Sequence, residues 1–430
     1  MLNNYELYNN YKTSFETPDD GYSYFFGYYD KSPLNIDNTK LLSHRVSFDG
    51  RDVKDGDVAD IGYFDLSTKE FIKLDETLAW NWQQGSQLQW LPPKFDEEII
   101  YNSIKDDNFI SIIYNIRTNK KRTIPFPIYV VHPNGQEALG INYERHYWCR
   151  GGYNYQNIKN KKWDKPYHKE DGIFKIDLEK ETVKLIVNIV DVVENNKLSE
   201  FETCNNWLEH MMYNPSGDRF MFFHRWNKDN IDYSRVYTVD SNDGKNIFMY
   251  PDVRFYSHYF WKDNNYLSIW TYEPKNNHSS LIKTSNFIQK SKNLKVILKP
   301  LYKLIKSLLS TKIKSKIINQ SKLLVFKDKT NNYTITGDNV LFGNGHQSWF
   351  NNKILLLNDT YQDNEYYRHL MIFNAEDNTF DFIGKFYSFY NDSVFRCDLH
   401  PRLSKNNKFL AIDSAHKKNR KIILIKIEKD

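Results

Sequence analysis

The stretch His210-Met-Met-Tyr-Asn-Pro-Ser-Gly-Asp-Arg-Phe-Met-Phe-Phe223 determines how the whole chain is interpreted, because its pattern recurs. A histidine stands five residues before a turn segment, and the turn leads into an apolar run. The same spacing places His258, His346 and His400 before turns that begin at Asp263, Asn351 and Lys405. One residue type repeated in one register indicates a structural repeat.

The register extends towards the N-terminus without the histidine. Pro33, Pro92 and Pro133 stand five residues after Tyr28, Gln87 and Ile128, and an apolar run follows each of these turns. Seven turns are thus followed by seven short apolar runs, and each run is typical of a β-strand. Most units continue with two more short strands, such as 61–66 and 71–74. The repeating unit is therefore a small antiparallel sheet.

Small sheets that cannot bury both faces alone are typical of a β-propeller, in which blades pack around a central channel. Seven registers predict an all-β protein with seven blades, folded as a single domain over residues 1–430. The last unit, which ends at 422–427, lacks a clear fourth strand. We expect the N-terminal stretch 22–27 to supply it, because closing the ring removes two exposed sheet edges.

Length and composition agree with one large all-β core, since the 430 residues include 16% aromatic residues and frequent Asn, Asp and Gly turns. No span is apolar enough for a transmembrane helix, and the first residues lack the features of a secretory signal. Three cysteines, at 149, 204 and 397, are too few for a disulfide scaffold. We expect a cytoplasmic protein.

The net charge of +5 is unevenly distributed. Residues 274–327 contain 13 lysines and no Asp, Glu or Arg, which leaves a net charge of −8 on the rest of the chain. Within this segment, predicted as an insertion in the fifth blade, Leu301, Ile305 and Leu308 share one helical face beside lysines. A basic amphipathic helix at 294–318 can lie on an anionic membrane surface, dock on a partner, or cover the blade beneath it. Nucleic acid is not expected, because the body is acidic and no binding motif accompanies the lysines.

The innermost strand of a propeller blade lines the channel, so a position repeated near its start points towards the axis at one end. The register therefore predicts that His210, His258, His346 and His400 converge there. Their imidazoles can bind a divalent metal such as Zn²⁺, and Cys397 can replace one of them as a thiolate. The alternative is that these histidines bond neighbouring strands.

A second group of residues lies in the segment Asn142-Tyr-Glu-Arg-His-Tyr-Trp-Cys-Arg-Gly-Gly-Tyr-Asn-Tyr155, which follows a strand of the third blade. Tyr143 or His146 can accept a proton, and Arg150 can pair with a substrate carboxylate. The rings available to stack on sugars are Trp148, Tyr153 and Tyr155. The alternative is an aromatic loop packed over the channel mouth. The Gly151-Gly152 pair favours a ligand site, because glycine lets the backbone approach a ligand closely.

Several motifs together resemble a known family. They are Phe26-Gly-Tyr-Tyr-Asp-Lys-Ser-Pro33, Asp218-Arg-Phe-Met-Phe-Phe-His-Arg-Trp226, Ser257-His-Tyr-Phe-Trp261, Gly345-His-Gln-Ser-Trp349 with Asn358-Asp-Thr-Tyr361, and Arg396-Cys-Asp-Leu-His-Pro-Arg402 with Asp413-Ser-Ala-His416. In these motifs, which span nearly the whole chain apart from the insertion, the chain resembles the seven-bladed propeller polysaccharide lyases, ulvan lyases most closely and oligogalacturonate lyases more distantly.

This resemblance implies a metal-containing propeller that cleaves uronate-containing chains by β-elimination. A cation neutralises the uronate carboxylate, and a Tyr or His base removes the proton at C5. Tyr143 and Arg150 match these roles, and the four histidines with Cys397 match a metal-type cluster.

The chain departs from the family in two respects. These lyases use histidines in the second blade, where this chain has Gln84 and, on the following strand, Asn102. Amides can bind a sugar but cannot serve as a base. The lyases are also secreted, whereas this sequence shows no export signal. A second hypothesis is therefore a membrane-peripheral protein of surface or capsular polysaccharide biosynthesis, which binds sugar without cleaving it.

Overall fold

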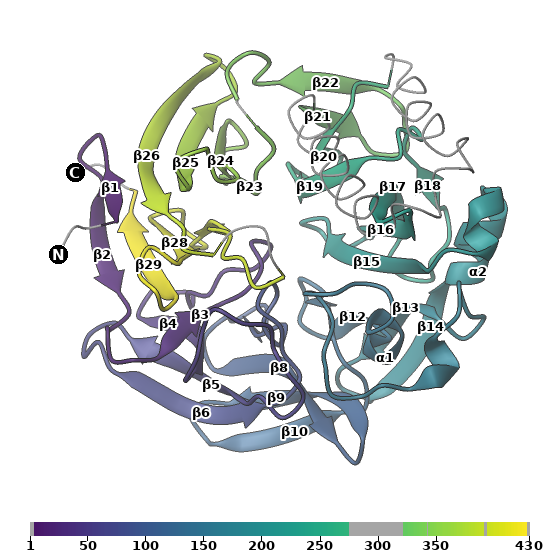
Figure 1. Cartoon of the computed structure of the whole chain (residues 1–430), viewed down its shortest axis with the longest axis horizontal. Helices are drawn as coiled ribbons and strands as arrows, with labels where there is room; N and C mark the ends of the chain where they lie inside the picture. The colour runs from purple at the N-terminus through teal and green to yellow at the C-terminus, as the bar shows by residue number, and fades with distance from the viewer. Residues whose placement is uncertain (1–3, 275–320, 342, 391–393, 428–430) are drawn as a thin grey trace, which may run out of the picture.

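Seven antiparallel sheets surround a central axis in the computed structural model, which describes residues 4–274, 321–341, 343–390 and 394–427 (Figure 1). Six of the sheets in these residues have four strands and one has five. The prediction of an all-β, seven-bladed propeller is confirmed. The seven predicted turns each join the first and second strands of one blade.

The blades follow one another along the chain. The first three comprise β3 (Ser23–Phe25), β4 (Lys40–Val46), β5 (Ala59–Asp65) and β6 (Phe71–Thr77); β7 (Gln89–Trp90), β8 (Glu98–Lys105), β9 (Asn108–Asn115) and β10 (Lys120–Ile124); and β11 (Val130–Val131), β12 (Glu137–Ile141), β13 (Gly172–Asp177) and β14 (Thr182–Asn188). The fourth and fifth comprise β15 (Asn206–Tyr213), β16 (Arg219–Lys228), β17 (Ile231–Asp240) and β18 (Phe248–Met249); and β19 (Tyr256–Trp261), β20 (Tyr266–Thr271), β21 (Lys322–Lys327) and β22 (Tyr333–Thr336).

The last two blades include both ends of the chain. The sixth comprises β23 (Gln347–Trp349), β24 (Leu355–Asp359), β25 (Tyr367–Asn374), β26 (Thr379–Tyr387) and, outermost, β1 (Tyr5–Leu7). The seventh comprises β27 (Arg402–Leu403), β28 (Phe409–Ser414), β29 (Lys421–Lys426) and β2 (Lys12–Glu16). Short helices α1 (Tyr143–His146) and α2 (Ile189–Asn195), and 3₁₀ turns at Lys161–Trp163 and Ser199–Glu202, lie in connections near the third and fourth blades.

The hydrophobic core lies between neighbouring blades. One buried cluster joins Leu42 of the first blade, Ile99 of the second and Leu424 of the seventh. The turns interlock as well: Gly217 has a φ of +81°, and a Cβ built on it would lie 2.2 Å from Nε2 of His132 in the adjacent blade. Only glycine fits this close approach.

The strand that closes the ring is not the one that the sequence predicted. β2 pairs with β29, with Lys12 opposite Lys426 and Glu16 opposite Ile423. The predicted stretch 22–27 instead contains β3, the innermost strand of the first blade. The reason is burial: β3 is buried along its whole length, whereas β2 is an edge strand in which only Phe15 is buried, so its apolar signal is weak.

A buried ion pair fastens the seventh blade to the first. Arg402 Nη2 lies 2.9 Å from Oδ2 of Asp413, and both side chains are almost fully buried. The Asp413 carboxylate also accepts hydrogen bonds from the backbone N–H groups of Phe26 and Gly27, and Arg402 Nε donates to the Tyr28 carbonyl. The pair thereby fixes the segment that leaves β3.

The segment 274–327, predicted as an insertion, begins after β20 and includes β21, which are the second and third strands of the fifth blade. Its predicted end at residue 327 is wrong, because residues 322–327 form β21. The end was placed too late because the segment was defined by its lysines. Lys322 and Lys327 belong to the strand, where they flank a buried Leu-Leu-Val-Phe run. The predicted amphipathic helix at 294–318, with its proposed membrane contact, lies outside the described residues. None of the helices in the described residues is long and apolar enough to traverse a bilayer.

Replacing Asp413 by Ala should lower the free energy of unfolding by about 3–5 kcal/mol, because it leaves the buried Arg402 charge without its partner. Urea denaturation would measure the loss, with Asp164→Ala, at an exposed position, as the control. A loss of stability no larger than that of the control would contradict a stabilising role for the Arg402–Asp413 pair.

The closing strand should respond to acid through Glu16. Burial raises the pKa of Glu16, but hydrogen bonds and charges from His416 and Lys417 outweigh burial and lower the pKa from 4.5 to about 2. A lowered folded-state pKa stabilises the protein above about pH 4.5, and this stabilisation is lost as the pH falls through about 2. Glu16→Gln should therefore be less stable than the wild type at neutral pH, and the two should converge near pH 2. Chemical denaturation across this range, with Glu376→Gln as the control, measures the difference; a constant difference would contradict the assignment.

Candidate functional site

The four histidines of the repeat register lie at one end of the central channel. His210 belongs to β15 and His258 to β19, while His346 directly precedes β23 and His400 lies two residues before β27. All four are at most 7% exposed. The ring of Tyr28, which holds the same repeat position in the first blade, lies 5.2, 6.1 and 5.0 Å from the rings of His210, His346 and His400. The shared register therefore corresponds to a shared place in the fold.

Three of these histidines and one carboxylate form a compact group, which we call the histidine cluster: His258, His346, His400 and Asp398. The His346 ring lies 3.9 Å from the His258 ring and 4.4 Å from the His400 ring. One ligand atom from each of His346, Asp398 and His400 lies within 4.8 Å of the others. Imidazole nitrogens and a carboxylate oxygen at this spacing are a ligand set for a divalent cation.

Neighbouring side chains orient two of the imidazoles. Nδ1 of His346 lies 3.0 Å from the Asp359 carboxylate, and Nδ1 of His258 lies 2.8 Å from Oδ1 of Asn344. An acceptor at Nδ1 fixes the ring and leaves the lone pair on Nε2, as is usual for metal-binding histidines. Burial lowers the pKa of His258 and of His400 well below the usual value, so both rings are neutral.

Cys397 and His210 are not part of this group. The Cys397 thiol faces the Asp398 carbonyl, and burial raises the pKa of this thiol to about 12, so it stays protonated. His210 stacks on Tyr28 with an interplanar angle of 9°, and its Nδ1 lies 2.8 Å from the Tyr129 hydroxyl. The structure thus gathers three of the four histidines and brings in Asp398 where the sequence suggested Cys397.

Two arginines keep the Asp398 carboxylate charged. Arg396 Nε and Arg368 Nη1 lie 2.8 and 2.9 Å from its two oxygens. Burial raises the pKa of Asp398, but the charges of Arg396 and Arg368 outweigh burial and hold the pKa far below its usual range. The cluster therefore contains an anionic oxygen beside neutral imidazoles, a combination that fits a divalent cation.

Glu209 is the centre of a second group of charges. This carboxylate is 1% exposed and lies 2.6 Å from Arg225 Nε, 3.3 Å from Arg150 Nε and 3.1 Å from His146 Nε2. Burial raises the pKa of Glu209, but Arg150 and its other neighbours lower it well below the usual value. Arg150 also pairs with Asp232 at 2.8 Å. Arg150, the predicted carboxylate clamp, and His146, one of the two predicted bases, are thus both paired with carboxylates of the protein itself.

Tyr153 connects the two groups. The Arg150 guanidinium lies 4.7 Å from the centre of its ring, and Arg396 Nη2 donates to its hydroxyl at 3.2 Å. Its ring also meets the His210 ring edge-on, with centroids 5.6 Å apart. Because Arg396 pairs with Asp398 as well, the 142–155 segment and the histidine cluster share one end of the channel.

Tyr143 and Tyr155 bind each other. Their rings stack 4.1 Å apart at an angle of 10°. The Tyr143 hydroxyl accepts a hydrogen bond from Gln87, and burial raises the pKa of Tyr143 well above its usual value. The Tyr155 hydroxyl accepts from the amide of Asn102. These contacts place both rings in the protein's own packing.

The remaining predicted sugar contacts also have protein partners. The amide of Asn102 donates to the Ile128 carbonyl and accepts from the Ile128 N–H, so it is fully used. Gln84 donates to the Tyr129 hydroxyl at 2.6 Å. Trp148 donates to the Asn160 carbonyl at 3.0 Å.

Sequence reasoning missed Glu209, Asp398 and the arginines at 225 and 396. A carboxylate two residues before a register histidine was the available signal for Asp398; strand alternation gave none, since residues 398–400 lie outside the strands and His400 has a φ of +45°. Glu209 gave no such signal, because it adjoins His210. A bulge follows Glu209, and His210 has a φ of +56°. This irregularity lets Glu209 and His210, although adjacent in sequence, both face the channel.

Two solved structures are similar to this chain over almost its full length. Oligogalacturonate lyase from Vibrio parahaemolyticus has a TM-score of 0.61 and 14% sequence identity, covering 99% of this chain and 97% of that one. An oligogalacturonate lyase in complex with manganese has a TM-score of 0.61 and 16% identity, covering 99% and 96%. This likeness is one of fold. Neither a family model nor a curated protein sequence matches the chain. The expected similarity to ulvan lyases stays a prediction.

Proposed function

We propose that this protein binds an acidic oligosaccharide at the histidine end of its channel and cleaves it by β-elimination beside a uronate. The observation that carries the proposal is the meeting of Arg150 and Arg396 at Tyr153, next to the histidine cluster, with Arg225 paired to the same Glu209 carboxylate as Arg150. Arginine forks suit carboxylates, and their exposed fractions of 16%, 10% and 24% leave part of each side chain accessible. The fold shared with oligogalacturonate lyases supports the same reaction class.

Arg150 and Arg396 lie on different parts of Tyr153, over its ring and at its hydroxyl. A uronate carboxylate between them would receive hydrogen bonds from both guanidinium groups. Neutralising that carboxylate makes the proton at C5 more acidic, because the negative charge of the intermediate spreads onto the carboxylate oxygens. The arginines therefore bind the substrate and stabilise the transition state.

We assign the base to Tyr153 rather than to Tyr143 or His146. The Tyr143 hydroxyl is bonded to Gln87 inside a stacked pair, and His146 Nε2 faces Glu209. Tyr153 carries its hydroxyl beside Arg396. Its oxygen takes the C5 proton, the electron pair forms the C4–C5 double bond, the C4–O bond breaks, and the proton that the hydroxyl already carried passes to the departing oxygen.

The histidine cluster is the proposed site of a divalent metal. The ion would act there as a Lewis acid on a carboxylate oxygen of the substrate. Imidazoles suit zinc and carboxylates suit manganese, so the donor set accommodates either. The compact group of ligand atoms comprises His346, Asp398 and His400 and does not include the Cys397 thiol.

Tyr153→Phe should lower kcat by about 10²–10⁴-fold with little change in KM, because the ring remains while the proton acceptor is lost. Oligosaccharides of galacturonate, glucuronate and mannuronate are the substrates, and the ultraviolet absorbance of the unsaturated product is the readout. Tyr366→Phe, at an exposed position, is the matched control. If wild-type protein bound these oligosaccharides without forming unsaturated product, elimination would be refuted and the second hypothesis, sugar binding without cleavage, would stand.

Dialysed protein should retain a stoichiometric divalent metal in elemental analysis, and His346→Ala or His400→Ala should lose it. His369→Ala, on β25 and bonded to Asp363, should keep the metal, and so should Cys397→Ser. The proposed metal site would be refuted if the wild type held only trace metal, or if all variants held equal amounts. Loss of metal from Cys397→Ser would instead show that the Cys397 thiolate is a metal ligand.

A further inference from the structure

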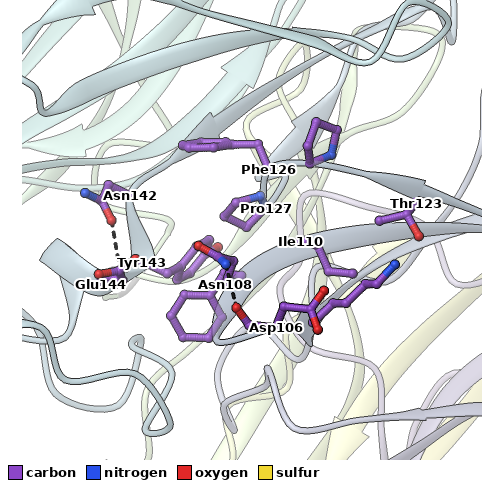
Figure 2. Close-up of a pocket in the computed structure, with 12 residues that line it drawn as sticks. Asp106, Asn108, Ile110, Thr123, Phe126, Pro127, Asn142, Tyr143 and Glu144 are labelled. Carbon is purple, nitrogen blue, oxygen red and sulfur yellow. Dashed lines mark hydrogen bonds between the residues drawn. The ribbon is translucent and has the colours of Figure 1, made fainter.

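A cavity of about 370 Å³ opens between the second and third blades, beside α1 (Figure 2). Its walls come from the β8–β9 hairpin, from the connection between β10 and β11, and from the start of α1. Sites for small molecules have volumes of roughly 300–1,000 Å³, so this cavity can hold a compact ring. The candidate site described above uses Tyr143 but none of the other lining residues.

Part of the cavity wall is apolar and aromatic. Phe109 and Tyr143 are buried there, with their ring centroids 6.3 Å apart, and Phe126 and Pro127 complete the wall. Figure 2 shows Phe126, Pro127 and Tyr143 among the side chains that line the cavity. Flat apolar surfaces of this kind pack against the C–H face of a pyranose ring, because that face forms no hydrogen bonds with water.

The rim of the cavity offers polar groups without partners. Lys105, Asp106 and Thr123 line it, and within the described part of the chain their side chains make no hydrogen bond or ion pair. A carboxylate, an ammonium group and a hydroxyl can donate to and accept from sugar hydroxyls. An apolar wall beneath such a rim is the composition of a carbohydrate subsite.

The cavity is linked to the channel by hydrogen bonds. The Tyr143 hydroxyl accepts from Gln87 Nε2 at 3.1 Å, and the same nitrogen donates to Gln84 Oε1 at 3.2 Å. Gln84 Nε2 in turn lies 3.4 Å from His210 Nδ1. Tyr143 therefore lines the cavity while its hydroxyl belongs to the hydrogen-bond network of the candidate site, which places the two at the same end of the propeller.

We propose that this cavity is a second glycan subsite, which holds one pyranose ring of an oligosaccharide that extends outwards from the channel. Its ring packs against Phe126 and Phe109, and its hydroxyls bond Asp106 and Thr123. The identity of the ligand as a glycan rests on the proposed function, but the subsite does not require elimination. Both neutral and uronate sugars have the pyranose ring, and Lys105 would add a partner for a uronate carboxylate.

Titration calorimetry of the Tyr153→Phe protein with galacturonate oligosaccharides and cello-oligosaccharides of increasing length tests the subsite. Phe126→Ala in this background should weaken binding of long chains by about three- to tenfold and leave the shortest ligands unchanged. Because Phe126 also packs on Phe174, with centroids 4.6 Å apart, Asp106→Asn is the second variant. Asn tolerates the φ of +49° at this exposed turn, so the fold is kept while the carboxylate is lost.

Phe389→Ala, which removes an exposed aromatic ring outside the cavity, is the control and should bind every ligand as the parent does. Equal losses for both sugar series support recognition of the ring itself, and a loss confined to galacturonate supports recognition through Lys105. Unchanged affinities in Phe126→Ala and Asp106→Asn overturn the subsite even if the enzyme cleaves. If the wild-type protein cleaves nothing but binding depends on chain length and these variants weaken it, only the proposed elimination is overturned. Failure to bind any oligosaccharide overturns both.

Discussion

The antiparallel pairing of β2 with β29 is the contact on which the rest of the molecule depends. A propeller blade buries its faces only against two neighbours, so a ring that is not closed leaves two blades half exposed. Closure brings residues 12–16 beside residues 423–426, and the buried Arg402–Asp413 pair then fixes the segment after β3. That segment carries Tyr28 between the histidines of three other blades. The geometry of the site is therefore a consequence of ring closure.

Charge compensation is the second constraint at this end of the channel. Arg150, Arg225 and Arg396 are tolerated here because Glu209 and Asp398 lie against them. A buried carboxylate with this many partners stays ionised, and its partners keep fixed positions. Under the proposed function, this arrangement would hold the arginines ready for a substrate carboxylate at low cost in reorganisation.

The repeat register predicted the blade count and all seven turns, because each turn follows from local chemistry that is visible in a few residues. Contacts between distant segments were harder to predict. The closing strand was misplaced because an edge strand needs only one buried residue, here Phe15. Cys397 was preferred to Asp398 because residue type was weighed alone, and the left-handed backbone at His400, with a φ of +45°, is not visible in the sequence. Gln84 and Asn102 were expected to meet sugar, but their amides complete hydrogen bonds between blades.

The sequence by itself determined the seven-fold repeat, the position of a histidine in four successive blades and the aromatic, arginine-containing excursion of the third, since each is written in contiguous residues. Only the tertiary structure decided which of these residues meet. Three histidines join Asp398 while His210 turns to Tyr28 and Tyr129, and Tyr153 joins the excursion to the cluster through Arg396. The physical reason is that a propeller channel assembles its lining from one or two residues of every blade, so the neighbours of each side chain are fixed by ring geometry and not by spacing along the chain.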